Sequence, residues 1–158
     1  PDAQAGALTV RAASRDRVQP RAAARKLLVQ ALYQWHLARQ PVAELEAQYA
    51  ASPEFAKADR DYFRAALGAI CAEGSGIDED LARHSDIEPA RLDPVEHAVL
   101  ALGIWELMNR PEVPYRVVIN EGVELAKRFG ATDGHRYVNA VLDRASRAHR
   151  GPERGEVA

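Results

Sequence analysis

Apolar residues recur every three or four positions along most of this chain, which is the spacing of amphipathic helices. The clearest example is residues 113–143, where two such patterns are separated by a short turn. In that turn Gly130 suits a left-handed helix C-cap, and Thr132 or Asp133 suits an N-cap. The pattern therefore predicts two packed helices joined by a tight, charged turn.

The same spacing predicts further helices before this pair. The apolar stripe of residues 21–38 indicates one buried side, whereas residues 95–108 are apolar on nearly every face, which favours a central helix capped by Asp93. No stretch alternates apolar and polar residues for long enough to predict a strand. We expect an all-α protein of about seven helices, including shorter ones at 42–51, 58–72 and 77–84. A flexible basic arm (1–20) should precede two small packed helical bundles (21–74 and 75–148), which are divided at the glycines near residue 75. A disordered tail (149–158) should follow them.

Composition narrows the class of protein. A chain of 158 residues can bury a sizeable core, and its single cysteine, Cys71, cannot form an internal disulfide. There is no apolar run of membrane-spanning length and no apolar signal-peptide core at the N-terminus. We therefore expect a cytoplasmic protein that does not span a membrane.

The charge is unevenly distributed, although the net value is only −2. Six basic residues face one acidic residue in the segment 11–28, a local excess of five that leaves −7 on the remainder of the chain. A basic segment on an acidic body points toward partners that carry phosphate, although solubility alone also explains such charge.

Catalytic and metal-binding patterns are weak. The five histidines have no Cys or His three or four positions away, so we expect no metal site and no cofactor. Glu121 and Glu124 could converge on a helix, but Lys127 and Arg128 make ion pairs within that helix a simpler explanation. Because no phosphate-binding loop or nucleophile elbow is present, we do not expect an enzyme.

Two clusters suggest binding instead. On a helical wheel Arg25, Lys26 and Tyr33 share a flank with Val29 and His36, away from the apolar stripe. One interpretation is an RNA site in which the cations hold phosphates and the ring stacks on a base. The other is a solvated helix face with a tyrosine at the rim of the core.

The second cluster opens the last helix. Asp133, His135, Arg136 and Tyr137 bring charge, an imidazole and an aromatic ring to a place where free backbone amides point outward. This arrangement could hold single-stranded RNA, and helix capping beside a rim aromatic accounts for it equally well.

Three segments resemble one known family. They are RKLLVQALYQW (residues 25–35), LDPVEHAVLALGIWEL (92–107) and VPYRVVINEGVELAKRFGATDGHRYVNAVLD (113–143). In this order they resemble the NusB family of bacterial transcription antitermination factors, and the similarity extends from about residue 21 to residue 145. It implies a non-enzymatic protein that binds boxA-type RNA together with NusE, a ribosomal small-subunit protein, within the RNA polymerase antitermination complex on ribosomal RNA operons.

The resemblance also implies roles for single residues. The arginine-rich segment of the family falls on Arg21 and Arg25, and its RNA-facing tyrosine falls on Tyr33. The acidic and aromatic positions of the last turn and helix fall on Asp133 and Tyr137. Glu96 matches a family glutamate near the RNA and NusE surface.

Departures from the family pattern shape the remaining expectations. Ala22 and Ala23 stand where many members have arginines, and Gly134 stands where serine is common, so we expect weaker phosphate contacts unless the arm contributes through its own arginines. Residues 133–137 should lie beside Arg25 and Tyr33 in the fold. Two alternatives remain. The chain could form a homodimer that buries the basic flank, or it could be a helical protein-interaction or oligomerisation module without sequence-specific RNA binding.

Overall fold

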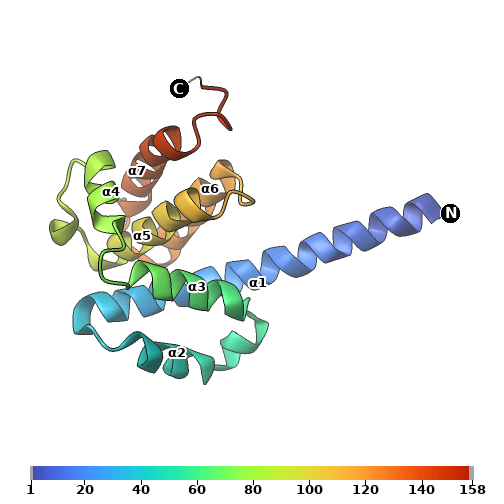
Figure 1. Cartoon of the computed structure of the whole chain (residues 1–158), viewed down its shortest axis with the longest axis horizontal. Helices are drawn as coiled ribbons and strands as arrows, with labels where there is room; N and C mark the ends of the chain where they lie inside the picture. Colours follow the sequence, from blue (N-terminus) through green and yellow to red (C-terminus); the bar gives the residue numbers. More distant parts are fainter. Residues whose placement is uncertain (1, 157–158) are drawn as a thin grey trace.

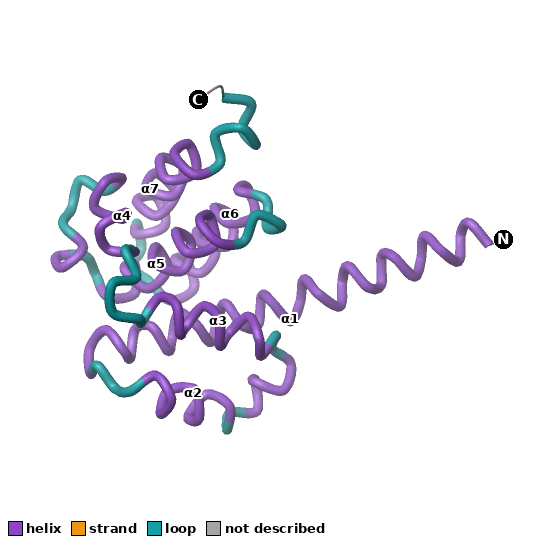
Figure 2. The backbone as a smooth tube through the Cα atoms, in the orientation of Figure 1, coloured by secondary structure: helices purple, strands orange, loops and turns teal. Residues whose placement is uncertain are grey.

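The structure is a computed structural model that describes residues 2–156, and side chains from residue 19 onward. Helices and connecting turns make up the described residues, and no strand occurs among them (Figure 2). This confirms the predicted all-α class. The α-helices are α1 (Asp2–Ala38), α2 (Val42–Ala50), α3 (Arg60–Ile70), α4 (Ile77–His84), α5 (Pro94–Asn109), α6 (Tyr115–Phe129) and α7 (Gly134–His149), with short 3-10 helices at Pro53–Lys57 and Pro89–Arg91.

The helix α1 begins much earlier than the expected start near Arg21. Its backbone is helical from Asp2, passes through Pro20, and extends away from the other helices at its N-terminal end (Figure 1). Alanine, glutamine and arginine favour helix locally without an apolar stripe, whereas Pro20 removes one helix donor and disfavours the interior of a helix. The carbonyl of Pro20 accepts a hydrogen bond from Asp59 N at 2.9 Å. Flexibility of the arm stays a prediction, and the side chains of its arginines Arg11, Arg15 and Arg17 lie outside the description.

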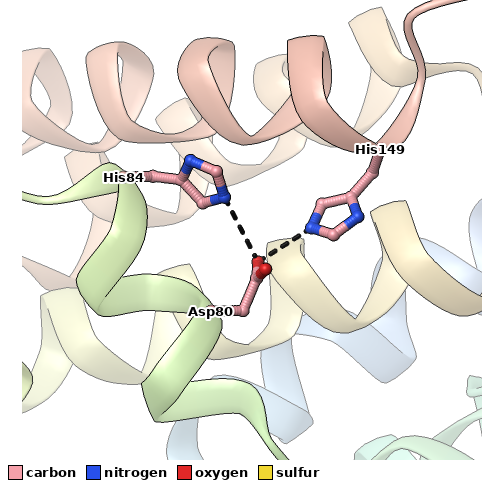
Figure 3. Close-up of side chains that lie close together, drawn as sticks. All are labelled: Asp80, His84 and His149. Carbon is pink, nitrogen blue, oxygen red and sulfur yellow. Dashed lines mark hydrogen bonds and ion pairs between the residues drawn. The ribbon is translucent and has the colours of Figure 1, made fainter.

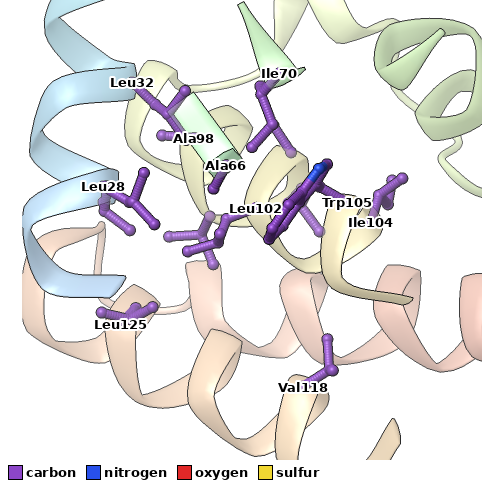
Figure 4. Close-up of a cluster of buried hydrophobic side chains, with 14 of the residues drawn as sticks. Leu28, Leu32, Ala66, Ile70, Ala98, Leu102, Ile104, Trp105, Val118 and Leu125 are labelled. Carbon is purple, nitrogen blue, oxygen red and sulfur yellow. The ribbon is translucent and has the colours of Figure 1, made fainter. Parts of the chain in front are cut away.

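The helix α5 is central, as its apolar composition predicts. It packs against α1, α3, α4, α6 and α7, and residues 97–107 are all buried. Asp93 caps it by accepting hydrogen bonds from Val95 N at 2.9 Å and Glu96 N at 3.3 Å. The core around this helix draws side chains from most of the elements, and Leu28, Leu32, Ala66, Ile70, Leu102, Trp105 and Leu125 are among them (Figure 4).

Two glycines let the last three helices approach closely. A Cβ atom at Gly103 of α5 would lie 2.7 Å from Leu142 Cδ2, and one at Gly122 of α6 would lie 2.7 Å from Leu142 Cδ1. The fully buried Leu142 of α7 therefore occupies the space that both glycines leave open. Any larger residue at either position would overpack this contact.

The turn between α6 and α7 differs from its predicted geometry. Gly130 has φ −98° and ψ −175°, which is extended rather than left-handed backbone. A glycine is favoured there for another reason, because a Cβ atom would lie 2.8 Å from the carbonyl oxygen of Ala126. Asp133 precedes α7 but its side chain makes no capping hydrogen bond.

The segment that follows α7, where a disordered tail was predicted, forms hydrogen-bonded turns over residues 151–155, and residues 157–158 lie outside the described residues. Arg150 is 7% exposed, and its guanidinium donates hydrogen bonds to four main-chain carbonyls at the end of α5 and the loop beyond it. Glu153 accepts from Arg150 Nη1 at 2.6 Å and from Tyr115 N at 2.9 Å. Glu106 O and Arg110 O also accept main-chain hydrogen bonds, from Arg110 N and Val113 N at 2.9 Å each. Leu107 O has no helical donor, because the residue four positions later is Pro111, so the guanidinium satisfies a carbonyl at the end of the helix. The composition of the segment gives no hint of this contact.

Candidate nucleic-acid interface

The first predicted cluster is divided between two sides of α1. Arg25 and Val29 are 4% and 2% exposed and face the core, whereas Lys26 is exposed and Tyr33 retains 40% of its surface. The prediction of one exposed flank was therefore wrong for Arg25 and Val29. The physical reason is that α3 and α5 cover this side of α1 and place an acidic partner opposite Arg25.

That partner is Glu106 of α5, which is 2% exposed. Arg25 Nη2 lies 2.9 Å from Glu106 Oε2, and Arg25 Nε donates to both carboxylate oxygens at 3.1 and 3.2 Å. Tyr62 of α3 donates its hydroxyl to the same Oε2 at 2.5 Å. We call these three residues the buried network.

The buried network has clear electrostatic consequences. Burial alone would lower the pKa of Arg25, but the Glu106 carboxylate outweighs it and the pKa is raised. Burial first, and then the charge and hydrogen bond of Glu106, raise the pKa of the Tyr62 phenol. Arg25 therefore stays charged and Tyr62 stays neutral, which makes the network part of the scaffold.

Arg21 is partly engaged within the protein. Its guanidinium lies 3.8 Å from Asp59 and 3.4 Å from Glu112, and over the ring of Tyr62 at 4.7 Å. The side chain keeps 25% of its surface. It borders the solvent, but two carboxylates already neutralise it.

Lys26 and Tyr33 lie on the other side of α1, along a set of adjoining hollows. These hollows share Lys26, Gln30, Tyr49 and Phe129 where they meet, so they form one surface, which we call the α1 groove. Its cations and rings come from α1, α2, the 3-10 helix before α3 and the end of α6. They are Lys26, Lys57, Lys127, Arg128, Tyr33, Tyr49 and Phe129, beside the acids Glu54, Glu121 and Glu124.

Several members of the α1 groove were absent from the sequence-based prediction. Lys57, Tyr49 and Phe129 belong to segments far from Tyr33 in sequence, so only the packing of the helices brings them together. Lys127 forms the expected ion pair with Glu124 at 3.5 Å. The cation and the ring that end α6, Arg128 and Phe129, are the one local signal that spacing could have supplied.

The start of α7 presents the second predicted cluster. Asp133 and Arg136 are about four-fifths exposed and form a loose pair at 4.0 Å. His135 is half-buried, and its Nδ1 atom is buried without a hydrogen-bond partner. Tyr137 packs against the core, and its hydroxyl forms a short hydrogen bond with Ser85 Oγ, beyond the end of α4. Its ring is therefore less free than that of Tyr33.

The first turn of α5 joins the two clusters. Val95 lines the α1 groove beside Tyr33 and Phe129. The next residue, Glu96, lies against Gly134 so closely that a Cβ atom there would overlap its carboxylate. Burial, and next the charge of Asp93, raise the pKa of Glu96. Direct adjacency of residues 133–137 and Tyr33 stays a prediction.

Three ligand-type side chains meet elsewhere, where no metal site was expected. Asp80, His84 and His149 offer donor atoms that lie within 4.8 Å of one another. Asp80 and His84 are four residues apart on α4, a spacing that sequence reasoning could have noticed had carboxylates been counted beside histidines. His149 comes from the end of α7 and could not have been assigned to them from spacing.

The one thiol is not activated. Burial raises the pKa of Cys71 to about 12, so the nucleophilic thiolate is scarce at neutral pH.

None of the described helices is long and apolar enough to cross a membrane. The described residues thus form an all-helical protein that presents cations and aromatic rings along the α1 groove.

Comparison with known proteins identifies the family. The NusB family model matches residues 22–147, and this chain belongs to the NusB family. The transcription antitermination protein NusB of Pseudomonas putida (strain W619) is 54% identical over 130 residues, which cover 82% of this chain and 78% of that protein. The protein of the same name from Alcanivorax borkumensis is 49% identical over 133 residues, covering 84% and 89%.

Solved structures agree on the fold. The structure of T. maritima NusB superposes with a TM-score of 0.74 at 28% identity, covering 87% of this chain and 98% of that one. A crystal structure of NusB and NusE in complex with double-stranded RNA gives a TM-score of 0.64 at 24% identity, covering 85% and 98%. At that identity the second structure shows the shared fold alone.

Proposed function

We propose that this chain is a transcription antitermination factor that binds boxA-type single-stranded RNA together with NusE. It acts within the RNA polymerase antitermination complex and favours read-through of ribosomal RNA operons in the cytoplasm. The observation that carries the proposal is the family match over residues 22–147, which contains all of the α1 groove except Gln19. Relatives that are 49–54% identical are named for transcription antitermination, and a structural relative at 24% identity was crystallised with NusE and double-stranded RNA.

The α1 groove supplies the proposed RNA contacts. Lys26 and Arg128 would neutralise phosphates, and the 40% exposed ring of Tyr33 would stack on an unpaired base. Arg25 is left out, because its guanidinium already holds Glu106. Arg21 would contact RNA only from the edge of the surface, since it is paired with two carboxylates.

The start of α7 supplies a second contact in this proposal. Arg136 is exposed and would reach a phosphate, while Asp133 and His135 would bind base edges. Tyr137 would hold the start of α7 in place through Ser85 and offer only the free edge of its ring. Glu96, between this cluster and the α1 groove, would lie at the boundary with NusE. The role is one of binding, with no catalytic step and no cofactor.

The direct test is fluorescence anisotropy with a labelled boxA-like RNA. The full chain is titrated with and without NusE, against a scrambled RNA and against the same sequence as a duplex. We expect tighter binding of the single-stranded boxA sequence, further strengthened by NusE. Equal affinity for boxA and scrambled RNA under both conditions would contradict the proposal and favour a protein-interaction module.

A matched pair of variants locates the site. Arg128→Gln removes a cation of the α1 groove, and Arg64→Gln removes an exposed cation of α3 that does not line it. Only the first should weaken RNA binding. Equal losses would indicate that the chain attracts RNA by overall charge rather than through the α1 groove.

A further inference from the structure

Asp80, His84 and His149 converge where α4 packs against the end of α7 (Figure 3). His149 Nε2 lies 2.8 Å from Asp80 Oδ2, and His84 Nε2 lies 3.5 Å from the same oxygen. Both imidazole rings thus direct a nitrogen at one carboxylate. Two histidines and a carboxylate are a recurrent ligand set for divalent transition metals.

These three side chains are largely buried, so the surrounding helices hold them in place. The side chain of Asp80 is 5% exposed, that of His84 12% and that of His149 21%. The Nε2 atom of His84 is buried and makes no hydrogen bond. A buried nitrogen without a partner is costly in a native structure, and a bound ion would remove that cost.

The distances from Asp80 to the two histidines are close to those between ligands of a metal ion. Ligand atoms at about 2.0–2.1 Å from a tetrahedral Zn²⁺ lie about 3.4 Å from one another. The 3.5 Å separation of His84 Nε2 and Asp80 Oδ2 already has this value, and His149 Nε2 needs to move away from the carboxylate by roughly half an ångström. Arg83 Nη1, 3.7 Å from Asp80 Oδ1, belongs to a 73% exposed side chain that can leave.

We propose that Asp80, His84 and His149 bind one divalent first-row transition ion of the zinc class. Binding would replace the hydrogen bond between His149 and Asp80 with one metal bond from each side chain, and His149 would ligate as the neutral imidazole, its ring proton carried on Nδ1 instead of Nε2. Three protein ligands leave a fourth tetrahedral position for water.

The site would connect two parts of the fold that the backbone joins only distantly. The metal would fix α4 to the last residue of α7, directly before Arg150. Because Arg150 holds the carbonyls at the end of α5, metal binding should also make the segment 150–156 more ordered.

The test uses the full chain, freed of metal by a chelator, and titrated with Zn²⁺ by isothermal calorimetry and with Co²⁺ by visible absorption. We expect one ion per chain, an intense Co²⁺ spectrum of tetrahedral type and a higher melting temperature with Zn²⁺. His84→Ala and His149→Ala should each weaken Zn²⁺ binding on the order of 100-fold or more, because loss of a ligand exceeds loss of an outer partner.

The control is His36→Gln, which removes one histidine outside the cluster and should leave Zn²⁺ binding unchanged. Equal weakening in all three variants, or unchanged binding in both cluster variants, would overturn the proposal. So would the absence of binding to the unmodified chain, a result that does not depend on whether any variant folds. RNA affinity measured on the metal-free chain tests the proposed function separately.

Discussion

Arg25 and Lys26 are adjacent cations on α1, and the fold gives them opposite roles. Arg25 lies in the core with a carboxylate and a phenol, whereas Lys26 lies in the exposed α1 groove. One residue of rotation about a helix is about 100°, enough to move a side chain from a packed side to an open one. Residue type alone therefore does not distinguish a structural cation from a binding one.

The energetics of the two sides differ accordingly. Removing a charge from water is costly, so a buried pair such as Arg25 and Glu106 adds little net stability compared with apolar residues packed in the same place. Losing one partner is much more destabilising, because it leaves an uncompensated buried charge. An exposed cation such as Lys26 carries no such penalty. Substitutions on the buried side should therefore change folding, and those on the groove side should change binding.

The largest expected effect is on the stability of Arg25→Ala. It leaves Glu106 buried without its cation and should lower the free energy of unfolding by about 3–5 kcal/mol. Urea denaturation followed by circular dichroism measures this change. The adjacent Lys26→Ala is the control, and should stay within about 0.5 kcal/mol of the unmodified chain. Similar losses in both would remove the distinction between the two sides.

A smaller loss is expected for Tyr62→Phe, which removes the hydrogen bond to Glu106 and should cost about 1.5–3 kcal/mol. The pKa of Tyr62 is raised in the folded protein, so above the ordinary tyrosine pKa of about 10 the unfolded state loses this proton first. The stability from this group is complete below that pH and falls as pH rises further. Unfolding measured from about two pH units below that value to about one unit above it should show a shallower decline of stability in the variant. An unchanged slope would contradict the assignment.

On the groove side, Tyr33→Ala should weaken binding of the boxA-like RNA by about 1–3 kcal/mol, because a stacking ring is lost. Its exposed position predicts little change in stability. Tyr33→Phe keeps the ring and should keep most of the affinity, as measured by anisotropy. If both variants lost RNA affinity equally, the hydroxyl rather than the ring would be the contact.

The smallest effect is expected for Lys26→Gln. Losing one phosphate contact to a single strand should reduce the slope of log affinity against log salt by about 0.7. Anisotropy titrations over a range of salt concentrations measure it. Arg64→Gln serves again as the control, and a slope equal to that of the unmodified chain would exclude Lys26 from the interface.

Local signals were sufficient for most of the helices. The helix at residues 77–84 has the predicted bounds, and Asp93 caps α5 as expected from an acidic residue before proline. Both depend on interactions within a few residues, which sequence displays directly. Gly130 was assigned the wrong backbone conformation because the close approach to Ala126, rather than a positive φ, requires glycine there.

The candidate sites were less predictable, because they depend on residues distant in sequence. Glu106 lies 81 residues from Arg25, and His149 lies 69 residues from Asp80. Spacing could suggest an exposed flank on α1 but could not show that an acidic side chain from α5 faces it. The resemblance of three segments to a known family supplied what periodicity could not, namely the kind of partner.

The sequence by itself determined that the chain is helical, which helix is central and to which family the chain belongs. Helix periodicity, capping and family motifs all depend on residues that are close together in the sequence. Only the tertiary structure decided that Arg25 belongs to the core, that Arg150 holds the end of α5, and that Asp80, His84 and His149 meet. Each of these contacts depends on which polar side chains from distant parts of the sequence face one another, or face a main-chain carbonyl, in the folded protein. That is set by the packing of whole helices against one another.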